Sequence, residues 1–135
     1  MHPAGKIPVI NDDGFILFES NAINAYLAIK HRSPLYPQDV REQAKVDQWV
    51  SFVTIHVGGA FDRVLFNRVF APLVGLPVDE GSLRTGEKFL HRFLPVVDKR
   101  LQEKPYFFDE MTLADINLLA ILDPAETAGL KLQEW

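Results

Sequence analysis

Cysteine is absent from this chain of 135 residues. That absence excludes disulfide bonds and any cysteine nucleophile within the sequence, and it leaves the cellular compartment undetermined. Positive charge does not predominate either, since 14 Lys and Arg stand against 18 Asp and Glu, which gives a formal net charge of -4, and the basic residues form no cluster in the sequence. Nucleic acid is therefore not expected as a partner.

Long apolar runs are absent too. No run approaches the ~20 residues that a membrane-spanning helix needs. The opening residues Met1-His2-Pro3 do not resemble a signal peptide. We therefore expect a cytoplasmic protein that has no membrane partner.

The sequence also lacks the residue spacing that is typical of metal ligands. The four histidines, His2, His31, His56 and His91, lie far apart in the sequence. Asp12-Asp13-Gly14 lacks the alternating acids and the terminal Glu of a calcium loop. We therefore expect no metal, and we interpret the histidines as solvated or at the edge of the core.

The sequence does contain a hairpin pattern near its start. Ile7 to Ile10 and Phe15 to Phe18 are short apolar runs rich in residues that favour strands. Between them, Asp13-Gly14 favours the positive φ angles of a tight turn. This pattern predicts two antiparallel strands.

A helix start follows the second predicted strand. Ser20 is a good N-cap for a helix that continues through Tyr26 and Lys30. The unpaired N–H groups of such a first turn bind a carboxylate. From these residues alone, a simple cap is the favoured interpretation of Glu19 and Ser20.

Helical periodicity dominates the rest of the chain. It predicts a long helix from Val40, with Gly58-Gly59 marking a kink or a close helix contact. Asp79 opens a further helix that keeps one apolar face despite Pro95. A helical bundle is expected, with core positions that include most of Phe52, Phe61, Phe66 and Phe70.

Thr112 and Asp115 form a predicted capping box. The Thr112 hydroxyl can accept a hydrogen bond at the start of a helix while the Asp115 carboxylate reaches back to the Thr112 N–H. We assign this box a role in folding and no chemistry.

Together these motifs resemble the glutathione transferase family, and the theta- or phi-like types of bacteria in particular. The resemblance rests on Gly5-Lys6-Ile7-Pro8, the acidic turn, Glu19-Ser20 and the linker Ser33 to Pro37, followed far downstream by the capping box. It implies an α+β fold. Residues 1–32 would be the closing half of a thioredoxin-like domain, a β-hairpin plus a helix, and residues 38–135 an all-helical domain.

The resemblance also implies a glutathione site. In that family the proline matching Pro8 is cis, and the residue before it, here Ile7, offers its backbone to the cysteinyl part of glutathione. Glu19 and Ser20 would hold the γ-glutamyl group, which fits their chemistry, since Glu19 can pair with an ammonium. Lys6 would lie near the glycyl carboxylate.

A pocket for a small hydrophobic electrophile is implied as well, and the helix after the linker lines it in the family. His56 or Phe66 could face that pocket, although core packing is the more ordinary interpretation of an aromatic residue on a helix. Family members are typically dimers, so a homodimer is expected.

Part of the family pattern has no counterpart in this sequence. A complete thioredoxin-like domain would place roughly 50 residues before Gly5, including the catalytic Tyr, Ser or Cys, and the family usually continues beyond Trp135. We expect the full-length form to conjugate glutathione to electrophiles, a detoxification reaction, and this chain to lack the catalytic segment. Three alternatives remain open: a truncated transferase, a subunit that depends on residues elsewhere, and a non-catalytic interaction module.

Overall fold

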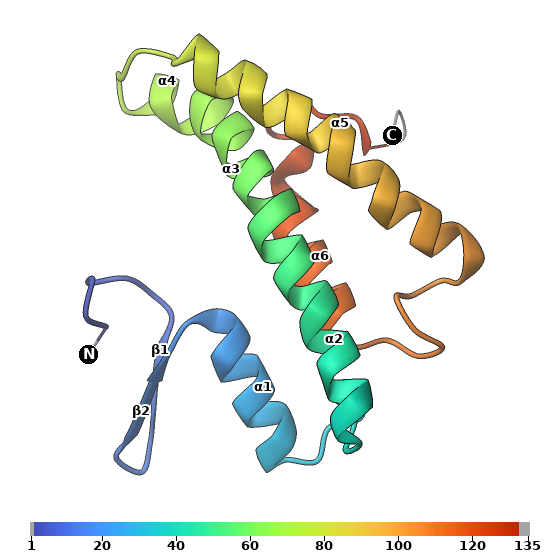
Figure 1. The fold of residues 1–135 in the computed structure, drawn as a ribbon. Helices are drawn as coiled ribbons and strands as arrows, with labels where there is room; N and C mark the ends of the chain where they lie inside the picture. Colours follow the sequence, from blue (N-terminus) through green and yellow to red (C-terminus); the bar gives the residue numbers. More distant parts are fainter. Residues whose placement is uncertain (1, 133–135) are drawn as a thin grey trace.

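A small β-hairpin and one helix precede a set of longer helices in the computed structural model, which describes residues 2–132 (Figure 1). The strands are β1 (Val9–Asp12) and β2 (Phe15–Phe18), and the helix that follows them is α1 (Ser20–Lys30). The remaining helices lie to one side of this unit. The α+β fold expected from the sequence is confirmed.

The hairpin closes through a two-residue turn. Val9 pairs with Phe18 and Asp12 pairs with Phe15. Asp13 has φ 50° and Gly14 has φ 94°, the positive angles expected for this dipeptide. The predicted first strand, Ile7 to Ile10, is wrong in its bounds. Pro8 has no N–H to donate to a ladder, and the short turn lets the strand continue to Asp12.

Glu19 is the N-cap of α1, so the prediction that Ser20 caps this helix is wrong. The Glu19 carbonyl accepts the first helical hydrogen bond, from Ile23 N–H at 2.9 Å. Glu19 has φ 70° and ψ 118°, so the chain turns there and Ser20 is already the first helical residue. Among residues 2–132, no side chain caps this end of the helix.

The long predicted helix is one continuous helical run that contains two π-helical turns. It comprises α2 (Val40–Phe52), η1 (Val53–Gly58), α3 (Gly59–Leu65), η2 (Phe66–Phe70) and α4 (Ala71–Leu73). Its start is capped by Asp39, whose carboxylate accepts the N–H groups of Arg41 and Glu42 at 2.9 and 3.1 Å. Figure 1 shows this run crossing the whole molecule.

Two further helices pack on the long run. They are α5 (Glu80–Glu103), which begins after the predicted cap Asp79, and α6 (Leu113–Leu122), which is followed by the short turn η3 (Asp123–Ala125). Pro95 lies inside α5, as expected. The capping box is confirmed, because the Thr112 N–H donates to Asp115 Oδ2 at 2.8 Å and the Thr112 hydroxyl accepts at the start of α6.

Small residues allow close helix contacts. A Cβ added at Gly86 would lie 2.7 Å from the Ala60 carbonyl oxygen, so α5 and α3 meet there through their backbones. A Cβ at Gly58 would lie 3.2 Å from Ile121 of α6, whereas one at Gly59 would meet nothing within 4 Å. Of the two predicted glycines, Gly58 therefore marks the close contact.

The core lies between the long run, α5 and α6. Phe61 is buried as predicted, and it belongs to the same core cluster as Val57 and Val64 of the long run. The expectation that Phe66 and Phe70 are core is wrong, since each is 47% exposed. Neither belongs to the core cluster.

Candidate functional site

The two segments that carry the predicted glutathione site leave the same end of the hairpin. Val9 and Phe18 are the last pair of the ladder. Pro8 and Glu19 are the next residues outward on the two strands, so both leave the same open end of the hairpin, where paired strands lie roughly 5 Å apart. Lys6-Ile7-Pro8 and Glu19-Ser20 are therefore the two segments that flank this end.

The first of these two segments is open to solvent. Lys6, Ile7 and Pro8 are all exposed, and the Ile7 side chain is 92% exposed. The Ile7-Pro8 peptide bond is cis, as the resemblance implies. The backbone of this loop is therefore accessible at the open end of the hairpin.

Glu19 adopts an unusual backbone conformation. A positive φ in a residue other than glycine costs about 1–3 kcal/mol and tends to occur at functional sites. The Glu19 side chain is 70% exposed. The first turn of α1 begins directly after Glu19, and its N–H groups, which no side chain in the described part of the chain caps, can receive an anion. Acceptor and donors thus sit side by side.

The opposite end of the hairpin is tied to α1 by charge. The Lys30 ammonium and the Tyr26 hydroxyl both donate to the Asp12 carboxylate. These two hydrogen bonds, first that of Lys30 and then that of Tyr26, lower the pKa of Asp12 below its ordinary value. The cluster fixes the hairpin, and with it the predicted site, relative to the helix.

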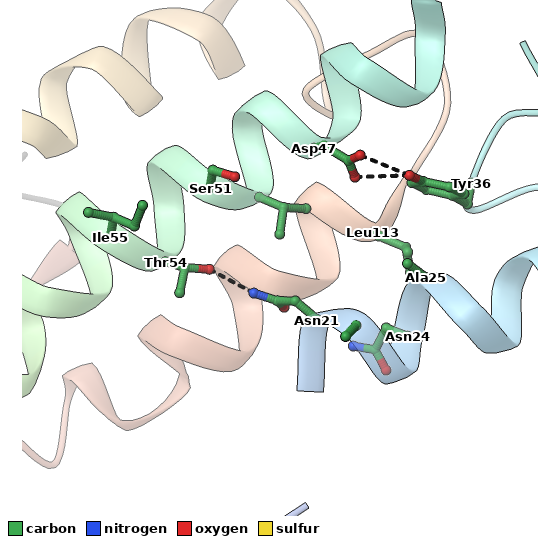
Figure 2. Close-up of a pocket in the computed structure, with 11 residues that line it drawn as sticks. Asn21, Asn24, Ala25, Tyr36, Asp47, Ser51, Thr54, Ile55 and Leu113 are labelled. Atoms are coloured by element: carbon green, nitrogen blue, oxygen red, sulfur yellow. Dashed lines mark hydrogen bonds between the residues drawn. The ribbon is translucent and has the colours of Figure 1, made fainter. Parts of the chain in front are cut away.

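A pocket of about 460 Å³ begins where the predicted site ends. Figure 2 shows it between α1, the long helical run and the start of α6. Its lining comprises Asn21, Ala22, Asn24, Ala25, Tyr36, Asp47, Val50, Ser51, Thr54, Ile55 and Leu113. Asn21 directly follows Ser20, so the pocket extends the open end of the hairpin toward the helical part of the chain.

Thr54 links three elements in this pocket. Its hydroxyl accepts a hydrogen bond from the Asn21 side chain at 2.9 Å and another from Asn117 of α6 at 2.9 Å. The first of these appears as a dashed line in Figure 2. The first turn of α1 is thereby held against the π-helical turn η1. The sequence carries no local signal for this contact, because its partners lie 33 and 63 positions apart.

Tyr36 closes the other end of the pocket. Its hydroxyl lies 3.0 Å from each carboxylate oxygen of Asp47 (Figure 2). Burial, together with this hydrogen bond, raises the pKa of Tyr36 to about 12. The phenol therefore remains neutral at physiological pH. The sequence did not indicate that Tyr36 belongs to a site, because an aromatic ring at this position is typical of amphipathic packing.

The two residues proposed for the electrophile lie away from this pocket. The ring of His56 lies between Phe52 and Phe93, with centroids 5.1 and 5.0 Å away. Phe66 lies about 15 Å further along the same helical run. Neither residue lines the pocket beside Asn21.

Within residues 2–132, no cluster of His, Cys, Asp or Glu side chains is arranged to hold a metal ion. In the same part of the chain, no helix has the length and apolar character to cross a membrane.

Comparison with known proteins identifies relatives with a similar sequence. Residues 1–29 match the family model of the glutathione S-transferase N-terminal domain. Glutathione S-transferase F10 of Arabidopsis thaliana is 35% identical over 120 residues, which cover 86% of this chain and 56% of that protein. The chain is therefore similar in sequence to glutathione S-transferases. Human glutathione S-transferase theta-2B is 32% identical over 134 residues, which cover 96% of this chain and 55% of that protein.

Solved transferase structures share the fold. Glutathione transferase F2 from Populus trichocarpa superimposes with a TM-score of 0.86 at 31% identity, over 93% of this chain and 61% of that one. A human theta-class transferase in complex with the glutathione conjugate of 1-menaphthyl sulfate gives 0.86 at 32% identity, over 97% and 55%. The chain spans about half the length of the curated transferases that it matches.

Proposed function

We propose that this chain supplies the glutathione-binding surface of a glutathione-conjugating protein. The observation that carries the proposal is that Lys6-Ile7-Pro8 and Glu19-Ser20 leave the same open end of the hairpin. Glutathione is a zwitterion with two carboxylates, so its recognition requires cationic, anionic and neutral hydrogen-bonding groups close together. This end of the hairpin offers all three.

Each group matches one part of the tripeptide. The Glu19 carboxylate pairs with the α-ammonium of the γ-glutamyl group, while Ser20 and the uncapped N–H groups of α1 receive its carboxylate. The exposed backbone of Ile7, next to Pro8, serves the cysteinyl part. Lys6 attracts the glycyl carboxylate.

In the full-length form, we propose, the bound thiolate attacks a small hydrophobic electrophile. No residue of this chain is assigned the activation of the thiol. His56 and Phe66 are the candidates for contact with the electrophile. Neither residue lines the pocket that begins at Asn21. An electrophile that touches either of them must therefore extend from this pocket along the helical run.

We propose a division into a glutathione-binding unit, residues 1–32, and a helical domain, residues 38–135, in a theta- or phi-like protein. We further propose a homodimer in the cytoplasm.

Glutathione affinity of the Glu19→Gln variant tests this function. The substitution removes the charge that pairs with the ammonium but keeps the size of the side chain and the backbone at the helix start. We expect calorimetry to show at least a 10-fold weaker binding of glutathione, as for the loss of one charge-assisted hydrogen bond. Glu126→Gln, an exposed acid near the other end of the chain, is the control and should bind as the wild type does. Unchanged binding by Glu19→Gln would contradict the proposed site.

A further inference from the structure

His2 contacts the carboxylate that the proposed function assigns to the ammonium of glutathione. Its Nε2 atom lies 3.4 Å from Glu19 Oε1. The imidazole also lies edge-on to Phe18, with ring centroids 4.8 Å apart. The His2 side chain is only 9% exposed, whereas that of Glu19 is 70% exposed. A ring that is largely fixed by packing therefore touches an acid that is largely in solvent.

A second hydrogen bond determines which nitrogen of His2 carries the proton. Nδ1 accepts the Ala4 N–H at 3.0 Å, so in the neutral ring the proton is on Nε2. That N–H faces Glu19 and donates to it. Among residues 2–132, His2 is the partner that holds this carboxylate, and it engages Oε1 alone.

We propose that His2 is a positioning residue, which orients the Glu19 carboxylate toward the α-ammonium of a γ-glutamyl ligand. This inference rests on the proposed function. An exposed Glu side chain samples several rotamers, and a ligand that needs one of them loses affinity when it has to select it. By holding Oε1, His2 leaves Oε2 free to accept from the ammonium in a preset direction.

If His2 positions Glu19, a substitution of His2 should weaken only the binding of the α-ammonium of the ligand. The probes are glutathione and its deaminated analogue, glutaryl-cysteinyl-glycine, which lacks only the α-amino group. We expect His2→Phe, which keeps a ring beside Phe18 but loses both nitrogens, to weaken glutathione binding about 3- to 10-fold in calorimetry. Binding of the deaminated analogue should not change.

Three comparisons separate positioning from a general structural effect. His2→Gln, which can still present an N–H to Glu19, should recover much of the glutathione affinity. In a Glu19→Gln background, His2→Phe should have no further effect, because its target is gone. His31→Phe, the same exchange at the far end of α1, should bind both ligands as the wild type does. Equal weakening of both ligands by His2→Phe would overturn the proposal, since it would indicate damage to the loop.

A measurement without ligand distinguishes this inference from the proposed function. Three-bond NMR couplings along the Glu19 side chain should report one dominant rotamer in the wild type and in His2→Gln, and averaged rotamers in His2→Phe. Averaged couplings in the wild type would overturn the positioning role whatever the ligand does. An ordered Glu19 that loses its order in His2→Phe, combined with no glutathione binding, would support the contact and contradict the proposed function.

Discussion

Asp12 shows how one residue can control the position of a site at the other end of its hairpin. It is the last residue of β1, and both of its hydrogen-bond donors, Lys30 and Tyr26, belong to α1. Because β1 is only four residues long, a hairpin released at Asp12 would also move Pro8 relative to the start of α1. The charge at Asp12 therefore affects both stability and the proposed binding geometry.

The pKa of Asp12 gives this contact a defined pH dependence. Because the folded pKa is lowered below 3.8, the folded state holds on to fewer protons than the unfolded state, and the contact stabilises the fold fully above about pH 4. Its contribution is lost as the pH falls through the lower folded pKa.

We expect Asp12→Asn to be less stable than wild type at pH 7 and to show a shallower loss of stability below about pH 4, measured by urea unfolding from pH 7 to pH 2. Asp13→Asn removes the neighbouring charge but neither of the two hydrogen bonds to Asp12, so it is the matched control. A parallel shift of the whole curve for Asp12→Asn would mean that its charge is not involved.

At the scale of elements, local signals in the sequence predict much of the fold. The turn follows from Asp13-Gly14, and the start of α6 follows from Thr112 and Asp115, because each depends on residues within a few positions. The contacts that complete the pocket could not be predicted. Thr54 is bound by Asn21 and Asn117, which are distant in the sequence, and a hydroxyl within a helix has no pattern that names its partner.

The two π-helical turns are the other features that the periodicity did not reveal. Each turn of this kind adds about one residue to the helix, which rotates the following side chains by about 100°. The same continuous run can therefore face α6 over α2 and η1, and face α5 over α3. The sequence also contains no sign of a second contact of Asp115. Besides its part in the capping box, its Oδ1 accepts the Phe107 N–H at 2.8 Å and fixes the loop before α6.

The packing of α5 on α3 should be sensitive to a single methyl group. Gly86→Ala places a Cβ against the Ala60 carbonyl and within 2.9 Å of the Arg63 Cβ, so the two helices must separate. We expect a loss of about 1–2 kcal/mol in the free energy of unfolding, because the clash exceeds the gain in helix propensity. The matched control is Gly59→Ala on α3, where a Cβ meets nothing within 4 Å and the propensity gain should appear as a small stabilisation. Equal effects of the two substitutions in chemical unfolding would contradict the close contact.

At the scale of the whole molecule, the hairpin leaves apolar side chains in solvent. Phe15 and Ile16 are 51% and 50% exposed, and among residues 2–132 the sheet consists of two strands whose outer edges have no neighbour. Strand edges of this kind pair with other chains. We expect the isolated chain to form dimers or larger species as its concentration rises, which light scattering over a dilution series will show.

A charge on the hairpin should suppress this association. Ile16→Lys places a cation on the exposed strand, and we expect it to shift the scattering toward the monomer. Leu119→Lys is the matched control, since Leu119 is 69% exposed but lies on α6. A wild-type chain that stays monomeric at every concentration would show that the strand edges do not associate.

The hairpin and α1 make few contacts with the other helices, so this part of the molecule should open before the rest unfolds. Residues 9–30 are held to the rest through a few contacts, notably Asn21 with Thr54 and the packing of Ala25 and Ala28, while the long run is enclosed by α5 and α6. The backbone amides of this unit should therefore exchange with deuterium through a local opening that costs less than global unfolding, whereas those of α3 and α5 exchange only when the whole chain unfolds. Glutathione bound at Glu19 would stabilise the closed form, and its affinity would then appear as slower exchange across α1 in particular.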